Sequence, residues 1–85
     1  MSIEVALRTE LRKVSLFPEQ VDTLGLHDSL FVSGILDSLG LVWLISLIEQ
    51  EFHLSIPLEE VSLDQFGTLA EIIAFIEQNE ERDHI

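Results

Sequence analysis

The chain of 85 residues contains no cysteine, and it has few residues that carry positive charge. Without cysteine it can form neither a disulfide bond nor a thiolate metal site. Its basic residues are Arg8, Arg12, Lys13 and Arg82, against 16 acidic residues, which gives a formal net charge of −12. Such a surface repels nucleic acid and anionic lipid, and it attracts basic patches on partner proteins. We therefore expect neither a nucleic acid nor a membrane as a partner.

A long apolar run is also missing at the start of the chain. The first residues, "MSIEVALRTELRKV", have charges spread among the apolar positions. This pattern predicts neither a signal peptide nor a membrane span. Together with the absence of cysteine, it favours the cytoplasm. The length predicts one small domain, here residues 1–78, followed by a polar and frayed tail at residues 79–85.

Motifs of catalytic and metal sites are missing as well. There is no H-E-x-x-H pair, no cysteine pair, no EF-hand loop and no glycine-rich phosphate loop. The nucleophile-elbow pattern G-x-S-x-G is only half present around Ser38, because Gly40 fits but Leu36 stands where the first glycine belongs. A serine nucleophile also needs a base within hydrogen-bond reach, and no histidine has a paired signature. We therefore expect no catalytic residue, no metal ion and no enzymatic activity.

Apolar residues at helical spacing predict an all-α fold, a small bundle of three main helices. The main helices are expected at Ile3 to about Leu16, from Asp37 or Ser38 to about Phe52, and from Thr68 to about Gln78. Thr68 and Glu71 have the spacing of a capping box. A minor helix is expected between Leu58 and Phe66, with a second possible box at Ser62 and Gln65.

The connection from Gln20 to Gly34 is long for so small a domain. Its scattered apolar residues show no clear period, and Ser33-Gly34 is a turn signal. A loop of this length is usually functional or held down by its own side chains. We expect Leu30 and Phe31 to hold it against the core.

The middle helix is apolar on two opposite sides. One side forms a sufficient core face on a helical wheel, with Leu41, Leu44, Ile45, Ile48 and Phe52. The opposite side holds Leu39, Trp43, Ser46 and Gln50. A helix that is apolar nearly all round is normally buried. The outer residues could close the core against the long loop or form an exposed patch for a partner. We favour the partner surface and add Glu49 to it.

Ser38 stands at the mouth of this helix, with the sequence "GILDSLG" around it. A helix start offers free N–H groups and the positive end of the helix dipole, so a phosphoryl group on Ser38 would be well placed. Taken alone, the position suits a simple helix cap equally well.

The residues around Ser38 resemble the attachment motif of the acyl carrier protein family, which includes peptidyl and D-alanyl carriers. The centre of the resemblance is Asp37-Ser38-Leu39, and it extends from Ile3 to about Gln78. The supporting matches are the serine at the start of a second helix, Glu49 and Glu51-Phe52 at its end, Ile56-Pro57 after it, and Thr68-Leu69 at the start of the last helix.

This resemblance implies that Ser38 carries 4′-phosphopantetheine through a phosphodiester, installed from coenzyme A by a phosphopantetheinyl transferase. The arm's thiol would hold an acyl or aminoacyl group as a thioester. Asp37 would help to bind the transferase and its metal ion. Other partners would be a loading ligase and downstream synthases or transferases of lipid, polyketide, peptide or cell-envelope biosynthesis. The carrier would be a monomer.

The sequence also departs from the fatty-acid-synthesis type of carrier. Carriers of that type have several acids just after the serine, where this chain has Gly40 and Trp43. The D-S-L-G sequence looks more like D-alanyl or standalone aminoacyl carriers. The alternative class is an acidic helical interaction module without a cofactor, in which Ser38 is only a cap. A cargo tunnel among Ile45, Ile48, Ile56, Phe66 and Ile73 is conceivable, but we favour plain core for this set because such stripes usually are core.

Overall fold

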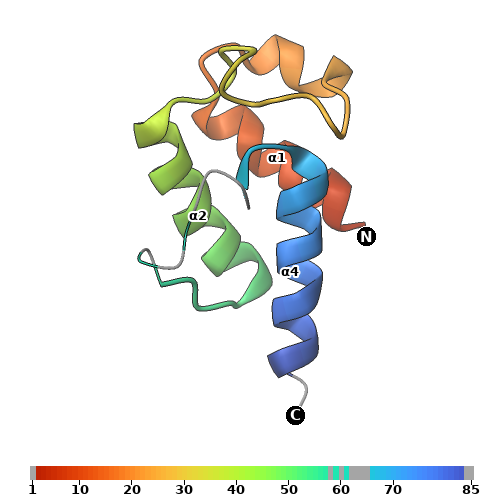
Figure 1. Cartoon of the computed structure of the whole chain (residues 1–85), viewed down its shortest axis with the longest axis vertical. Helices are drawn as coiled ribbons and strands as arrows, with labels where there is room; N and C mark the ends of the chain where they lie inside the picture. The colour runs from red at the N-terminus through yellow and green to blue at the C-terminus, as the bar shows by residue number, and fades with distance from the viewer. Residues whose placement is uncertain (1, 58, 60, 62–65, 84–85) are drawn as a thin grey trace.

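The computed structural model describes residues 2–57, 59, 61 and 66–83. In these residues the chain forms α1 (Ile3–Val14), the 3₁₀ helix η1 (Pro18–Thr23), α2 (Ser38–Phe52) and α4 (Leu69–Asp83). Within that part of the chain no β-strand occurs. The predicted all-α bundle is therefore confirmed (Figure 1). Much of the minor helix predicted between Leu58 and Phe66, including its capping box, lies outside the described residues.

Helix α1 follows the predicted apolar stripe. The Ser2 hydroxyl accepts a hydrogen bond from the Val5 N–H at 3.1 Å and so caps the helix start. Leu7 and Leu11 are fully buried, while Val14 is partly buried against the same core. The helix ends two residues before the predicted Leu16, because Ser15 and Leu16 already turn away to contact the loop before α2.

The long connection after α1 contains one element that the apolar pattern did not predict. Pro18 opens η1, where its fixed φ and missing N–H suit the first position of a helix. Leu30 is fully buried and Phe31 packs on the core, as expected. At Gly34 the backbone takes a φ of +81°, which a residue with a side chain would adopt only with strain.

Backbone hydrogen bonds fix this connection to two helices. The Leu30 N–H donates to the Gly67 carbonyl at 2.9 Å, and the Ala70 N–H donates to the Leu26 carbonyl at 3.0 Å. At the other end, the Ile35 carbonyl accepts from the Leu16 N–H and from the Ser15 hydroxyl, both at 3.0 Å. The loop is therefore held by the starts and ends of the helices around it.

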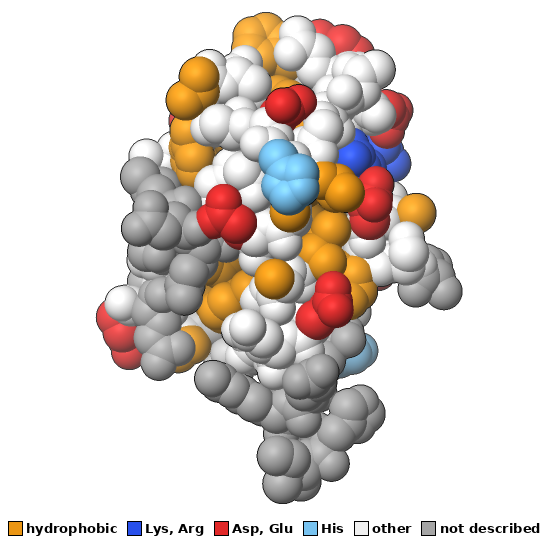
Figure 2. All heavy atoms as spheres, turned by 45° about the vertical axis from the view of Figure 1, so that its right-hand side comes forward, with side chains coloured by type: hydrophobic (Ala, Val, Ile, Leu, Met, Phe, Trp, Pro, Cys, Tyr) orange, Lys and Arg blue, Asp and Glu red, His pale blue; other side chains and the backbone are white. Residues whose placement is uncertain are grey.

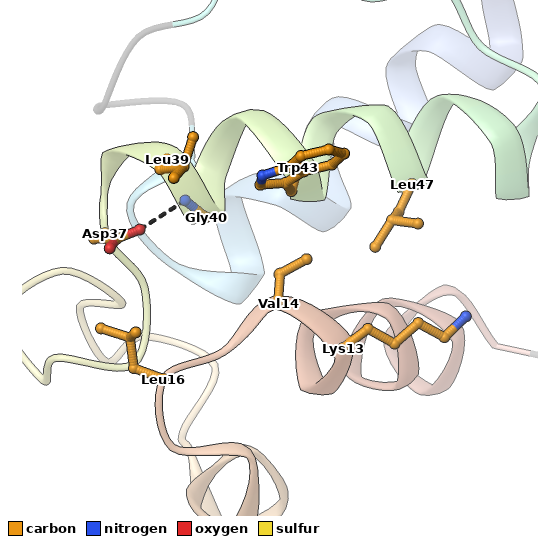
Figure 3. Close-up of a pocket in the computed structure, with 8 residues that line it drawn as sticks. All are labelled: Lys13, Val14, Leu16, Asp37, Leu39, Gly40, Trp43 and Leu47. Atoms are coloured by element: carbon orange, nitrogen blue, oxygen red, sulfur yellow. Dashed lines mark hydrogen bonds between the residues drawn. The ribbon is translucent and has the colours of Figure 1, made fainter.

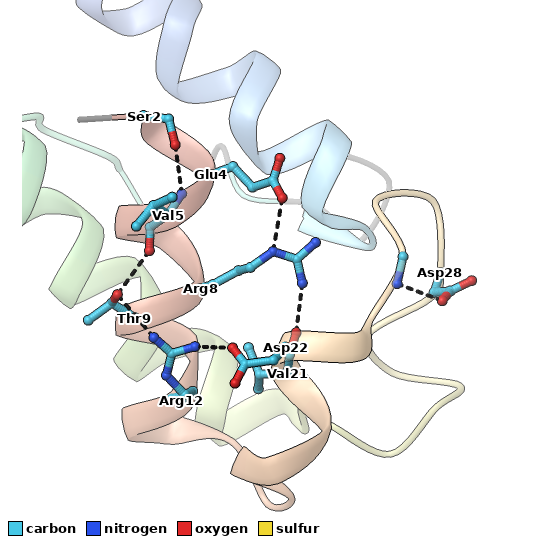
Figure 4. Close-up of polar contacts among 10 residues, drawn as sticks. Ser2, Glu4, Val5, Arg8, Thr9, Arg12, Val21, Asp22 and Asp28 are labelled. Carbon is cyan, nitrogen blue, oxygen red and sulfur yellow. Dashed lines mark hydrogen bonds and ion pairs between the residues drawn. The ribbon is translucent and has the colours of Figure 1, made fainter.

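Basic side chains of α1 also hold the long connection, through contacts with η1 (Figure 4). Arg8 donates to the Val21 carbonyl at 2.7 Å and to the Glu4 carboxylate at 3.1 Å, and only 15% of its side chain is exposed. Arg12 forms an ion pair with Asp22. Helix α1 thus uses two of the chain's few cations to hold η1.

Helix α4 begins at the predicted pair of capping residues but extends beyond its predicted end. The Thr68 hydroxyl accepts from the Glu71 N–H at 3.2 Å and donates to the Glu71 carboxylate at 3.0 Å, which confirms the predicted pairing of these residues. The helix continues beyond the predicted end at Gln78 to Asp83. The apolar stripe stops earlier, but the Glu, Gln and Arg residues that follow it have high helix propensity.

The core lies where the three long helices meet. It includes every residue named for a possible tunnel, four of them buried and Ile73 partly buried. This favours the reading of that set as plain core. Phe66 is fully buried, and its ring centroid lies 5.0 Å from that of Phe75.

The surface reflects the unbalanced charge of the sequence. On the face shown in Figure 2, acidic side chains are scattered among apolar and uncharged ones, while the basic side chains gather in one place. Across the described part of the chain, no helix is both long and apolar enough to cross a membrane.

Candidate functional site

The site is built around the start of α2. Asp37 is the N-cap: its backbone is extended, and its carboxylate accepts a hydrogen bond from the Gly40 N–H at 2.6 Å. The sequence left the choice of cap open between Asp37 and Ser38, and the structure assigns it to Asp37. The two residues before it, Ile35 and Leu36, are buried and anchor the approach to the helix.

Ser38 is the first residue of α2, and its side chain is exposed. Because Asp37 supplies the capping bond, Ser38 is not needed as the N-cap. Its hydroxyl projects at a helix start, where unpaired N–H groups and the helix dipole stabilise a negative charge. A phosphoryl group carried by Ser38 would therefore lie where its negative charge is stabilised.

Gly40 allows the start of α2 to lie close to its surroundings. A Cβ atom at this position would lie 2.9 Å from Leu36 Cδ1, 3.1 Å from Asp37 Oδ1 and 3.4 Å from the Val14 carbonyl oxygen. A glycine is costly in the interior of a helix, and its place in the first turn lessens that cost. Here the close approach of the Leu36 side chain and of the capping Asp37 carboxylate explains the glycine.

The two apolar sides of α2 have opposite exposures. Leu44 and Ile48 on the inner side have 0% exposure, whereas Leu39 and Trp43 on the outer side have 65% and 60%. Trp43 therefore does not close the core. Val42 is also exposed and was not singled out from the sequence, although it directly precedes Trp43.

The remaining residues of the predicted partner surface are less uniform. Gln50 is exposed and Ser46 is half-buried. Glu49 is half-buried too, and its carboxylate accepts a hydrogen bond from the Ile56 N–H at 2.8 Å. Glu49 therefore holds the loop after α2 in place, a structural role that the sequence did not indicate.

A groove of about 450 Å³ runs between α1 and α2 beside Ser38 (Figure 3). Its lining is mostly apolar and consists of Lys13, Val14, Leu16, Asp37, Leu39, Gly40, Trp43 and Leu47. The sequence did not predict this groove, because its α1 wall is defined only by the packing of the helices. One signal was present: Leu39, Trp43 and Leu47 follow each other at a spacing of four residues, which places them along one edge of a helix.

No group of three or more metal-ligating side chains comes together in the part of the chain that the structure describes. His53 ends α2 in the left-handed conformation, with a φ of 55°. Its backbone N–H donates to the Glu49 carbonyl, so His53 serves as a helix C-cap.

The comparisons with known proteins agree with this geometry. Residues 6–76 match the family described as the phosphopantetheine attachment site. The chain belongs to this family of carrier domains.

Among curated proteins, the chain is similar to the D-alanyl carrier proteins of Streptococcus pyogenes serotypes M5, M49 and M1. In each comparison it is 36% identical over 63 residues, which cover 74% of this chain and 78% of the relative. No solved structure matches the chain significantly.

Membership has direct consequences for the chemistry. The protein is a carrier and not itself a catalyst, its cofactor is a covalently attached 4′-phosphopantetheine, and its partners include transferases and ligases or synthases in general. The described residues fit this cofactor, since an exposed hydroxyl stands at a capped helix start beside an open groove.

Proposed function

We propose that the protein is a standalone aminoacyl carrier of the D-alanyl type, which holds its cargo on 4′-phosphopantetheine attached to Ser38. The single observation that carries this proposal is the arrangement at the start of α2, where Asp37 caps the helix and leaves the exposed Ser38 hydroxyl free for modification. The D-alanyl type is supported by the relatives and by the D-S-L-G sequence. The pathway would then belong to cell-envelope biosynthesis.

Each residue at the start of α2 has a distinct role in the attachment. The Ser38 oxygen forms the new bond to phosphorus, the pyrophosphate bond of coenzyme A breaks and releases adenosine 3′,5′-bisphosphate, and the serine proton leaves to a base of the transferase. The first N–H groups of α2 and the helix dipole then stabilise the charge of the phosphodiester. Asp37 keeps the helix start ordered, and its carboxylate is accessible to the transferase.

This role requires no base beside Ser38 within the chain. When bound, the arm supplies a terminal thiol that holds the cargo as a thioester. The chain has no cysteine of its own to compete for that cargo. Its residues therefore need to position the arm and to bind partner enzymes, and no proton transfer within this chain is required.

Partner enzymes would dock on the outer side of α2. This partner surface consists of Leu39, Trp43, Ser46, Glu49 and Gln50. The exposure of Leu39 and Trp43 supports it, because two large apolar side chains are left on the surface beside Ser38. The first turn of α2 has no acidic side chain, so docking here would depend more on apolar contact than on charge.

The proposal is tested by the intact mass of the protein after incubation with coenzyme A and a broad-specificity phosphopantetheinyl transferase. We expect a gain of one phosphopantetheine in the wild type and no gain in Ser38→Ala. Ser29→Ala is a matched control, since Ser29 lies in the long loop, and it should gain the same mass as the wild type. A folded wild-type protein that gains no mass would refute the attachment.

The cargo is tested separately on the modified protein. With ATP, D-alanine and a D-alanine-activating ligase, we expect a D-alanyl thioester that hydroxylamine releases. A parallel reaction uses a fatty acid and an acyl-activating ligase. Loading by the fatty acid alone would leave the carrier role intact and refute the aminoacyl type.

A further inference from the structure

The groove between α1 and α2 begins directly beside the proposed attachment residue. Asp37, Leu39 and Gly40, which flank Ser38 in the sequence, all contribute to its lining. We infer that this groove is a resting site for the chain's own phosphopantetheine arm, an inference that rests on the proposed attachment at Ser38. The arm would lie along the outside of the bundle between partner encounters.

The span of α2 from Ser38 to Leu47 matches the length of the arm. Ser38 and Leu47 are nine residues apart on α2, which corresponds to about 14 Å along the helix axis. The arm between phosphorus and sulfur has about as many bonds as four to five amino-acid residues, and it therefore spans about 15 Å when extended. An arm tethered at Ser38 thus places its thiol near the Leu47 end of the groove.

The chemistry of the lining also suits this occupant. Leu39 and Trp43 present exposed apolar surface to the arm's dimethyl group and methylene groups, opposite Val14 on α1. The groove is open to solvent, so the two amides of the arm can keep their hydrogen bonds to water. Burial of the apolar groups alone would stabilise the docked arm without leaving a polar group unpaired.

The opposite side of α2 offers less to the arm in this structure. Leu44 and Ile48 on that side have 0% exposure and already pack in the core. An arm that entered there would have to displace these contacts.

Lys13 lines the outer groove, while its ammonium group is held by the buried Glu10 at 3.1 and 3.2 Å. The groove can therefore be filled without breaking the core.

The fluorescence of Trp43 reports directly on an arm bound in the groove, because Trp43 is the only tryptophan of the chain and it lines the groove. The experiment compares the fluorescence of unmodified and modified wild-type protein, with modification confirmed by intact mass. We expect the emission of the modified protein to shift to shorter wavelength. Acrylamide quenching should fall by roughly half, because the arm would cover one face of an indole ring that is now largely exposed.

Variants separate groove binding from the mere charge of the phosphodiester. Leu47→Asp places a charge at the far end of the groove, and Leu16→Asp does so near Asp37 at a side chain that is 58% exposed. In both, modification should no longer change the emission or the quenching. Val42→Asp is the matched control on an exposed side chain of α2 outside the groove, and it should behave as the wild type.

The outcomes are distinct. A mass gain with unchanged emission would overturn the groove as a resting site while leaving the attachment at Ser38 intact. A spectral change that persists in Leu16→Asp would overturn it too, because that variant folds without relying on the changed side chain. No mass gain at all would refute the proposed function itself.

Discussion

Both faces of α2 carry large apolar side chains, but one face is buried and the other is exposed. The inner face holds Leu44 and Ile48 at 0% exposure, and the outer face leaves Leu39 and Trp43 more than half exposed. Burial of the inner face stabilises the fold, while the outer face contributes little to folding and adds a risk of aggregation. The difference shows that burial in the core does not explain the apolar outer face. We propose that binding, to a partner or to the chain's own arm, explains it.

The largest expected effect is the loss of stability caused by a substitution on the inner face of α2. Ile48→Ala should lower the free energy of unfolding by about 2–5 kcal/mol, because it removes buried methyl groups and leaves a cavity. Val42→Ala on the outer side should change that free energy by no more than about 0.5 kcal/mol. Urea denaturation followed by circular dichroism measures both. Equal losses in the two variants would show that the faces do not differ in their contribution to stability.

The next largest effect concerns the outer face of α2 in its proposed role as a docking surface for partner enzymes. Trp43→Ala should lower kcat/KM of the loading ligase for the modified carrier about tenfold, as expected for an aromatic anchor of an interface. Val5→Ala, an exposed apolar residue on α1, is the control and should leave turnover unchanged.

Salt dependence decides between apolar and charged docking for the same pair of proteins. We expect turnover of the wild type to fall only weakly between low and high salt. A Trp43→Ala carrier as active as the wild type, together with strong inhibition of the wild type by salt, would contradict docking through the outer face.

The smallest effect concerns the junction of the two faces at Asp37. Asp37→Ala should lower the free energy of unfolding by about 1 kcal/mol, because the Gly40 N–H loses its capping bond. Asp37→Asn keeps a good cap and should keep most of that stability. If the transferase needs the carboxylate itself, the Asn variant will be modified more slowly. An Asn variant as unstable as the Ala variant would argue against the capping role.

Periodicity in the sequence predicted the long helices well, because each carries an apolar stripe that must face a common core. It missed η1, whose six residues are too few to show a helical period and depend on Pro18 and on contacts from Arg8 and Arg12. It also placed the end of α4 at Gln78, because the stripe stops there while the helix does not.

In the candidate site, too, some features could be predicted from the sequence and others could not. The position of Ser38 at a helix start followed from local capping chemistry, which depends on neighbouring residues only. The role of Glu49 did not, because its hydrogen-bond partner is the Ile56 backbone beyond the end of the helix. The wall of the groove opposite α2, formed by Val14 of α1 and by Leu16 just after that helix, also arises from packing between distant segments.

The sequence by itself determined the helical class, the inner face of α2 and the D-S-L motif, because helical period and capping are properties of short segments. Only the tertiary structure decided that Asp37 and not Ser38 is the cap, that Trp43 stays exposed, and that a groove runs beside Ser38. These features depend on which segments pack against α2. A helical wheel records the direction in which a side chain points, but not whether another helix lies there.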